Sequence, residues 1–326
     1  MKDVIVVGAS AGGIRALKGV LAGLPRELPA SVLAVVHIPR HGTSVLPLIL
    51  DAAGPLPAKA AEDGEALARG TVYVAPPDRH LLVEGGRLRL TRGPRENRVR
   101  PCVDALFRSA AVDLGPRVVG VVLSGTLDDG TAGLWAIKDR GGVAVVQQPD
   151  EAEYPDMPAS ALANVEVDHV LRVAEMGPKL AALALEKSEA QAPVPDAMAA
   201  EAEIELGGHA LQKGVLELGV PSPNSCPECR GSLVEIREGP IVRYRCHTGH
   251  AYSLQTLLAE TDADIEKALW NAVRAIEERS FLRKAMERRA REAGDVALAD
   301  RLAADAARDV ADAQRVRRLT AGPAAA

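Results

Sequence analysis

Ser10 stands in a glycine-rich turn, Gly8–Gly12 with the sequence GASAG, between an apolar run and a helical pattern. Small neighbours let a serine project from a sharp strand-to-helix bend, where backbone N–H groups can stabilise an oxyanion. A dinucleotide-binding turn instead needs glycine at the position of Ser10 and an acidic residue where this chain has His37. The turn therefore favours a nucleophilic serine over a phosphate-binding loop.

Two further polar positions follow later β-branched runs. His37 ends the run Val32–Val36, and Asp128 and Asp129 follow the run Val118–Leu123. The carboxyl ends of neighbouring parallel strands would bring a nucleophile, a base and an acid that orients the imidazole to one sheet edge. Taken singly, His37 could be a hydrogen-bonded core residue and the acids could cap a helix. Three roles at three strand ends favour catalysis.

The segments that must position these residues alternate between strand and helix patterns from residue 1 to about 184. Such alternation predicts an α/β fold with a doubly wound, mostly parallel sheet, and a turn at Glu84–Gly86 adds one antiparallel hairpin. Further strands are expected at Val4–Val7, Thr71–Val74, Leu81–Val83, Leu88–Leu90 and Val143–Val146, and helices at Ile14–Leu24, Ser44–Ala53, Val103–Leu114 and Ala132–Arg140.

Composition excludes several classes of protein. With 326 residues, 47% hydrophobic and 25% charged, the chain is long and apolar enough for about two folded units. Eight aromatic residues and a net charge of −5 give neither a base-stacking platform nor a basic field, so nucleic acid is not expected as a partner. The first apolar run stops at Gly8, which predicts neither a signal peptide nor membrane insertion, and hence a cytoplasmic protein.

A cysteine cluster marks a second folded segment. Residues 185–223 are rich in Glu, Ala and Pro and predict a linker, and residues 224–253 then predict a zinc ribbon. Sixteen residues that resemble a hairpin separate the pair Cys226 and Cys229 from Cys246. This spacing is typical of a structural zinc site. His250, across a glycine turn, is preferred over His247 as the fourth ligand.

The last part of the chain, residues 254–320, predicts a helical hairpin. From Asp262 to Leu319 there is no proline, and Gly294-Asp295 is the one break. Ile265, Leu269, Val273 and Ile276, with Leu282 or Arg283, drift along one helix face and form an apolar stripe. We expect this hairpin to bind a partner or to mediate self-association.

Several motifs of residues 3–184 resemble those of the bacterial chemotaxis protein-glutamate methylesterases, in the catalytic domain of that family. They occur in the family's order: GASAGG within Ile5–Gly13, HIP within Val36–Pro39, EDGE at Glu62–Glu65, YVAPPDRH at Tyr73–His80, NRVRPCVD at Asn97–Asp104 and GVVLSGTLDDGTAG at Gly120–Gly133. The resemblance implies that Ser10 is the nucleophile, His37 the general base and Asp129, rather than Asp128, the orienting acid.

The implied reaction is hydrolysis of glutamate γ-methyl esters on a methylated chemoreceptor or related signalling protein, with deamidation of glutamine as a related activity. It needs no cofactor for catalysis, and zinc is expected only as a structural ion. The backbone N–H groups of Ala11 and Gly12 are expected to form the oxyanion hole. The family usually carries an N-terminal receiver domain, which we expect this protein to lack because its catalytic strand begins at Val4.

Three more residues are candidate substrate contacts. Arg98 lies in a basic segment suited to an acidic receptor surface, although a solvated charge run explains it equally well. Thr126 stands where the family usually has another residue near the substrate, and Met157 matches a loop beside the cleft. The alternative to an esterase is a non-catalytic signalling adaptor that binds a partner through the zinc ribbon and helices. A nucleotide-binding protein is a weaker alternative.

Overall fold

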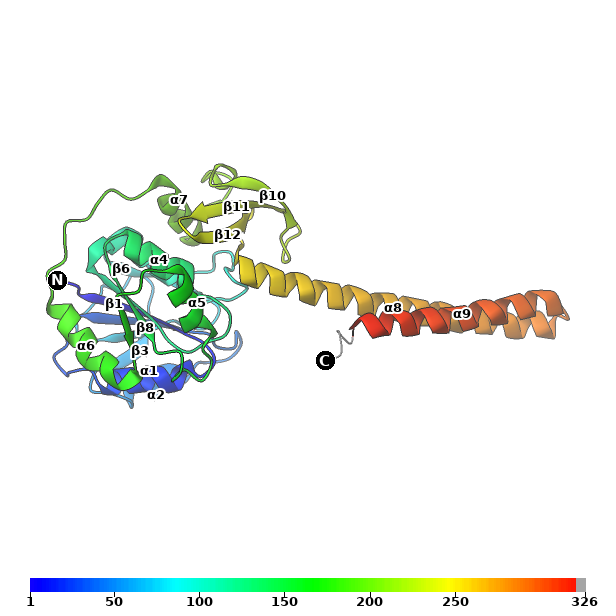
Figure 1. The fold of residues 1–326 in the computed structure, drawn as a ribbon, viewed down its shortest axis with the longest axis horizontal. Helices are drawn as coiled ribbons and strands as arrows, with labels where there is room; N and C mark the ends of the chain where they lie inside the picture. The colour runs from blue at the N-terminus through cyan, green and yellow to red at the C-terminus, as the bar shows by residue number, and fades with distance from the viewer. Residues whose placement is uncertain (321–326) are drawn as a thin grey trace. The chain divides into compact units, whose positions relative to one another are not determined.

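A seven-stranded parallel sheet organises the first half of the chain (Figure 1). The structure is a computed structural model that describes residues 1–320. The strand order is β3-β4-β2-β1-β7-β8-β9, with bounds β1 Val4–Ala9, β2 Ser31–Val36, β3 Ala58–Ala60, β4 Val72–Val74, β7 Val118–Val122, β8 Val143–Gln147 and β9 His169–Leu171. The strands that follow β1 in the chain first extend the sheet on one side of β1, beginning with β2, and later on its other side, beginning with β7. Open α/β sheets bind ligands at the carboxyl end of such a switch point.

Helices cover both faces of this sheet, as expected for a doubly wound fold. Alternate residues of β1 face opposite sides: Val4 and Val6 join one apolar core, and Ile5 and Val7 join the other. The first core is closed by α3 (Val103–Leu114), α4 (Thr131–Asp139) and α5 (Asp156–Asn164), and the second by α1 (Gly13–Ala22), α2 (Leu46–Asp51) and α6 (Val173–Leu185). The predicted hairpin, β5 (His80–Glu84) with β6 (Arg87–Thr91), forms a separate two-stranded sheet.

The segment expected to be a linker is instead packed onto the unit that the parallel sheet forms. It contains α7 (Asp196–Glu205) and a short 3-10 helix (Val215–Glu217), and Met198 joins an apolar core of the parallel sheet. Arg140 donates to the carbonyls of Ala192 and Pro193. Residues 1–257 form one compact unit. The expectation of a separating linker is therefore wrong, because buried partners hold this polar segment.

Four antiparallel strands follow, in the order β10 (Val220–Ser225), β11 (Ser232–Glu238), β12 (Ile241–Cys246) and β13 (Ala251–Ser253). We call residues 220–253 the Cys3His sheet. The turn at Glu238–Ile241 joins β11 to β12 as the predicted hairpin, with Leu233 paired to Cys246. A small core that includes Leu233, Tyr252 and Leu257 stabilises this sheet.

Two long helices, α8 (Leu254–Glu292) and α9 (Val296–Thr320), confirm the predicted helical hairpin, and residues from Leu258 onward form a second unit. Small residues and part of the expected apolar stripe close it. Ala299, Ala306 and Ala313 are buried, and so is Val273 of the stripe, whereas Ile265 is 53% and Leu282 66% exposed. Arg279 and Arg283 bind Asp309 across the two helices. Among residues 1–320, no helix combines the length and apolar composition needed to cross a membrane. Self-association stays a prediction.

Candidate functional site

The ends of β1 and β2 bring Ser10 and His37 together. Ala9 pairs with Val36 in the parallel register, so the next residue of each strand leaves the sheet at the same point, and the His37 N–H donates to the Ala9 carbonyl at 3.1 Å. Gly12 turns the chain from β1 into α1 with φ of 71°, a left-handed conformation that favours glycine. A Cβ atom there would lie 2.7 Å from the Ser124 hydroxyl oxygen.

The imidazole of His37 links Ser10 to Asp129. Its Nδ1 lies 3.0 Å from Ser10 Oγ, and its Nε2 lies 2.8 Å from Asp129 Oδ2. The His37 side chain is 18% exposed and the Asp129 side chain 4%. A chain of hydrogen bonds thus runs from a half-buried hydroxyl to a buried carboxylate.

Asp129 receives several hydrogen bonds besides the one from His37. The backbone N–H groups of Val103 and Asp104, at the start of α3, donate to its two oxygens at 2.8 and 3.2 Å. Burial by itself raises the pKa of Asp129, but hydrogen bonds from His37, Cys102 and Val103 outweigh it and lower the pKa to about 2. Asp129 is therefore ionised at neutral pH.

Asn97, Cys102 and Asp104 surround Asp129, and sequence reasoning assigned them no role. Asn97 Nδ2 donates to Asp129 Oδ1 at 3.1 Å and to Asp104 Oδ2 at 3.0 Å. Burial raises the pKa of the Cys102 thiol, which donates to Asp129 Oδ1 at 3.0 Å. All three residues belong to the family motif at Asn97–Asp104, which was the available sequence signal. The motif does not show that they contact Asp129, which only the tertiary structure reveals.

These hydrogen bonds define which nitrogen of the His37 imidazole carries the proton. Because the Asp129 carboxylate is ionised, it accepts a hydrogen bond from Nε2–H of His37, which leaves Nδ1 as the acceptor for the Ser10 hydroxyl. In the described part of the chain, the backbone N–H groups of Ala11 and Gly12 donate no hydrogen bond. Both groups lie before the N-terminus of α1, where a developing negative charge is stabilised. The geometry suits acyl transfer.

The other predicted site residues differ in accessibility. Arg98 and Thr126 are exposed. Met157 is fully buried, and a Cβ atom on Gly125 would lie 2.0 Å from its sulfur. A substrate contact by Met157 is therefore not supported, since its side chain packs beneath the Gly125 turn. Asp128 does not join the His37 hydrogen-bond chain, because its Oδ1 accepts from the hydroxyls of Ser253 and Thr256.

The cysteine cluster forms within the Cys3His sheet. One donor atom from each of Cys226, Cys229, Cys246 and His250 lies within 4.8 Å of the others. Cys229 Sγ lies 3.7 Å from Cys246 Sγ, and His250 Nδ1 lies 3.6 Å from Cys246 Sγ. A tetrahedron of sulfur ligands at about 2.3 Å from zinc has edges of about 3.8 Å. His247 is outside this group and packs against Gly231.

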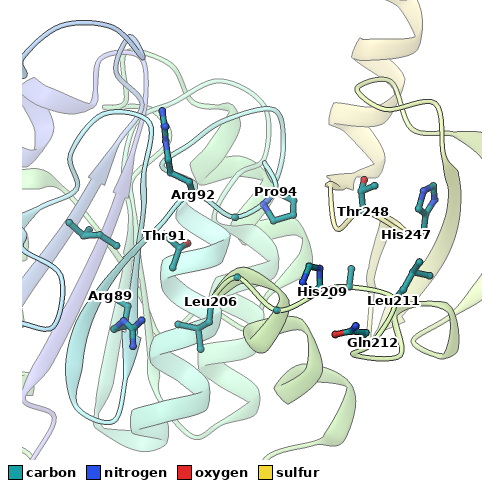
Figure 2. A pocket seen from close by; sticks show the side chains of 15 residues that line it. Arg89, Thr91, Arg92, Pro94, Leu206, His209, Leu211, Gln212, His247 and Thr248 are labelled. Atoms are coloured by element: carbon teal, nitrogen blue, oxygen red, sulfur yellow. The ribbon is translucent and has the colours of Figure 1, made fainter.

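A pocket of about 810 Å³ opens elsewhere in the same unit (Figure 2). Its lining comes from residues 89–94, residues 206–212, and His247 with Thr248. Arg89 and Arg92 in its wall are paired with acidic side chains, Asp63 and Asp78. Because none of the Ser10, His37 and Asp129 side chains lines this pocket, it is separate from the hydrogen-bonded site.

Comparison with protein families gives one match, a model described as CheB methylesterase, over residues 5–180. A crystal structure of the Thermotoga maritima CheB methylesterase catalytic domain is 34% identical, with a TM-score of 0.53. That alignment covers 56% of this chain and 98% of the Thermotoga chain. The structural similarity therefore spans that whole domain.

Curated relatives agree. A putative protein-glutamate methylesterase/protein-glutamine glutaminase of Leptospira interrogans is 40% identical over 178 residues, which cover 53% of this chain and 92% of that protein. Protein-glutamate methylesterase/protein-glutamine glutaminase 1 of Myxococcus xanthus is 40% identical over 185 residues, which cover 56% of this chain and 54% of that protein. The chain thus spans about half the length of the Myxococcus relative.

Proposed function

The chain belongs to the CheB methylesterase family, and from that premise we propose that it hydrolyses glutamate γ-methyl esters on a methylated signalling protein of the chemoreceptor kind. Deamidation of glutamine side chains is the related activity, because an amide and a methyl ester present the same carbonyl carbon to a nucleophile. The proposal rests on one observation above all: Ser10, His37 and an ionised Asp129 are joined by hydrogen bonds of 3.0 and 2.8 Å.

In the first half-reaction, Ser10 Oγ attacks the ester carbonyl carbon while His37 Nδ1 accepts the hydroxyl proton. The carbonyl oxygen becomes an oxyanion, which the N–H groups of Ala11 and Gly12 stabilise; one such donor typically contributes about 3–4 kcal/mol to the transition state. The imidazolium then returns its proton to the methoxy oxygen, and the C–O bond breaks to release methanol. Asp129 stabilises the imidazolium through Nε2–H.

In the second half-reaction, water replaces methanol. His37 Nδ1 accepts a proton from the water as its oxygen attacks the acyl carbon, and the same proton then goes to Ser10 Oγ when the acyl bond breaks. The products are a glutamate carboxylate and the regenerated serine. Arg98, exposed on the loop beside Asn97, is suited to attract an acidic protein surface to this site, and the exposed Thr126 is the other proposed substrate contact.

Ser10→Ala tests the proposal. We expect the variant to release no methanol from methylated receptor membranes and to escape fluorophosphonate labelling, while its melting temperature stays unchanged because only one oxygen is lost. Ser188→Ala is the matched control, since Ser188 is an exposed acceptor for the N-terminal ammonium group. An active Ser10→Ala variant would refute the nucleophile, and an unlabelled wild-type protein would favour the adaptor alternative.

We also propose that the Cys3His sheet holds one structural zinc ion through Cys226, Cys229, Cys246 and His250. The donor set suits zinc, and the sulfur–sulfur distance of 3.7 Å matches a tetrahedral edge. The hydroxyl of Thr248 lies 2.9 Å from Cys246 Sγ and 3.1 Å from Cys229 Sγ, a neighbour suited to stabilising two thiolates. Zinc supplies folding free energy to this small sheet, and the four protein ligands close the site to substrate.

Metal analysis of the purified chain checks this site. We expect about one zinc ion per chain, and none in Cys226→Ser. His247→Ala should keep the metal and His250→Ala should lose it, because only His250 lies within the donor group. The reverse order for the two histidines would contradict the assignment.

A further inference from the structure

Strand β13 of the Cys3His sheet forms backbone hydrogen bonds with the loop that carries Asn97. The Ala251 N–H donates to the Arg95 carbonyl at 3.1 Å, and the Asn97 N–H donates to the Ala251 carbonyl at 2.8 Å. These bonds pair Glu96 with Ala251 as in a parallel bridge. The backbone of residues 95–97 is therefore held from the side of β13.

Ser253, two residues further along β13, contacts two residues close to Asp129, namely Asn97 and Asp128. Its backbone N–H donates to Asn97 Oδ1 at 2.8 Å, and its hydroxyl donates to Asp128 Oδ1 at 2.7 Å. The first bond selects one orientation of the Asn97 amide, with Nδ2 toward Asp129 and Asp104. The second holds the residue that precedes Asp129 in the chain.

Six buried ionisable residues attach the Cys3His sheet to the rest of the unit. They are Glu96 and Arg108 of the catalytic half, Glu201 and Glu205 of α7, and Arg243 and Arg245 of β12, each at most 2% exposed. Arg245 donates to Glu201 at 2.9 Å, and Arg108 Nη2 donates to Glu96 at 2.8 Å. Burial raises the pKa of Glu96, but Arg108 and Arg245 outweigh it and hold that pKa well below its usual value. Separation would leave unpaired buried charges.

We propose that Ser253 is a positioning residue of the hydrolytic site, through which the Cys3His sheet holds Asn97 and Asp128 on either side of Asp129. The inference rests on the proposed function, since it gives the C-terminal sheet a part in orienting the His37 imidazole. Ser253 touches no reacting atom. It acts through Asn97, which donates to the Asp129 carboxylate, and through Asp128, which precedes Asp129 in the chain.

Fluorophosphonate labelling of Ser10 in the full chain tests this role, because a small probe needs no receptor surface. Ser253→Ala should label about tenfold more slowly, since small displacements of a catalytic group have large effects on rate. Ser253→Thr, which keeps the hydroxyl, should restore the rate. Ser222→Ala is the matched control: this β10 hydroxyl accepts hydrogen bonds only from Asn224 among the described residues.

A double-mutant cycle tests the route. If the hydroxyl acts through Asp128, Ser253→Ala should change the labelling rate by less than about twofold in an Asp128→Ala background. The Ser253 hydroxyl also accepts from the Thr256 N–H at the start of α8, so Ser253→Gly, which costs a helix cap little, separates the loss of capping from the loss of positioning. Labelling at the wild-type rate in both variants, or fully additive effects in the cycle, would overturn the proposal.

Hydrogen exchange supplies a readout that does not need catalysis. In Ser253→Ala, the amides of residues 127–130 should exchange faster because the hydroxyl bond to Asp128 is lost. The amides of residues 95–99, which backbone bonds from β13 hold, and those of the β5–β6 hairpin should stay unchanged, as should the melting temperature. Unaltered exchange at residues 127–130 would contradict the positioning role. Wild-type protein that does not label at all would refute the proposed function instead, so the two failures are distinguishable.

Discussion

At the scale of single residues, Asp128 and Asp129 are neighbours with different surroundings. Asp129 accepts from His37, Val103 and Asn97, whereas Asp128 accepts from hydroxyls. We expect Asp129→Asn to reduce methanol release by about a thousandfold or more, because the amide misorients the imidazole. Asp128→Asn keeps the Oδ1 acceptor and should lose less than about tenfold. Initial rates of both variants check this ranking, and the reverse order would move the orienting acid to Asp128.

His80 predicts a dependence of stability on pH. Burial lowers its pKa to about 4, and Nε2 bonds the Pro94 carbonyl while Nδ1 has no partner within residues 1–320. Protonation therefore favours the unfolded chain, whose histidine titrates near 6.5. Stability is complete above that pH and falls as the pH drops from about 6.5 to 4. The free energy of unfolding should decrease by about 2 kcal/mol between pH 7 and 5.

Urea unfolding of wild type and His80→Gln measures this term. Glutamine keeps an N–H that can reach the Pro94 carbonyl, but it does not titrate, so the difference between the two proteins should grow as the pH falls from 7 to 5. Equal pH dependence in both proteins would show that His80 does not carry the effect.

At the scale of elements, α7 is held by buried charges as well as by its apolar residues Met198 and Ile204. Glu201 is fully buried between Arg243 and Arg245, whereas Glu203 on the same helix is half exposed and pairs with Lys213. Glu201→Gln leaves buried arginines without their counter-charge and should destabilise residues 1–257 by about 3 kcal/mol. Glu203→Gln should change stability by less than about 1 kcal/mol. Thermal unfolding compares the two, and equal effects would contradict a buried network.

At the scale of the whole molecule, the compact unit ends at Leu257 rather than near residue 184. A chain that stops after residue 262 keeps every contact between β13 and the loop that carries Asn97. It should fold and should label at Ser10 at the wild-type rate. A chain that stops at Leu185 loses Ser253 and the buried charges of α7 and β12, and it should label more slowly. Equal labelling of both truncated chains would show that residues 186–257 do not support the site.

Although β3, β9, α5 and α6 were not predicted, most strands and helices around the parallel sheet, and the three candidate hydrolytic residues, could be predicted from the sequence. Their periodicities are local properties, and the carboxyl ends of adjacent parallel strands must share an edge, so Ser10, His37 and Asp129 were predictable from their places after three strands. The cysteine spacing is likewise local, because a hairpin brings its own ends together. The family motifs added the choice of Asp129 over Asp128.

The tertiary structure alone decided how residues 185–257 pack. Glu201 and Glu205 lie in a segment whose Glu- and Ala-rich composition predicted a linker, since composition cannot show that these side chains contact buried arginines about 40 to 100 positions away. The burial of Met157 was likewise not predictable, because the exposure of a side chain depends on the segments that pack over it, here the Gly125 turn. Ser253 reaches Asn97 across 156 positions, and no local pattern encodes such a contact. Long-range burial and ion pairing therefore place residues 185–257 in one compact unit with residues 1–184, which the sequence predicted to be a separate domain.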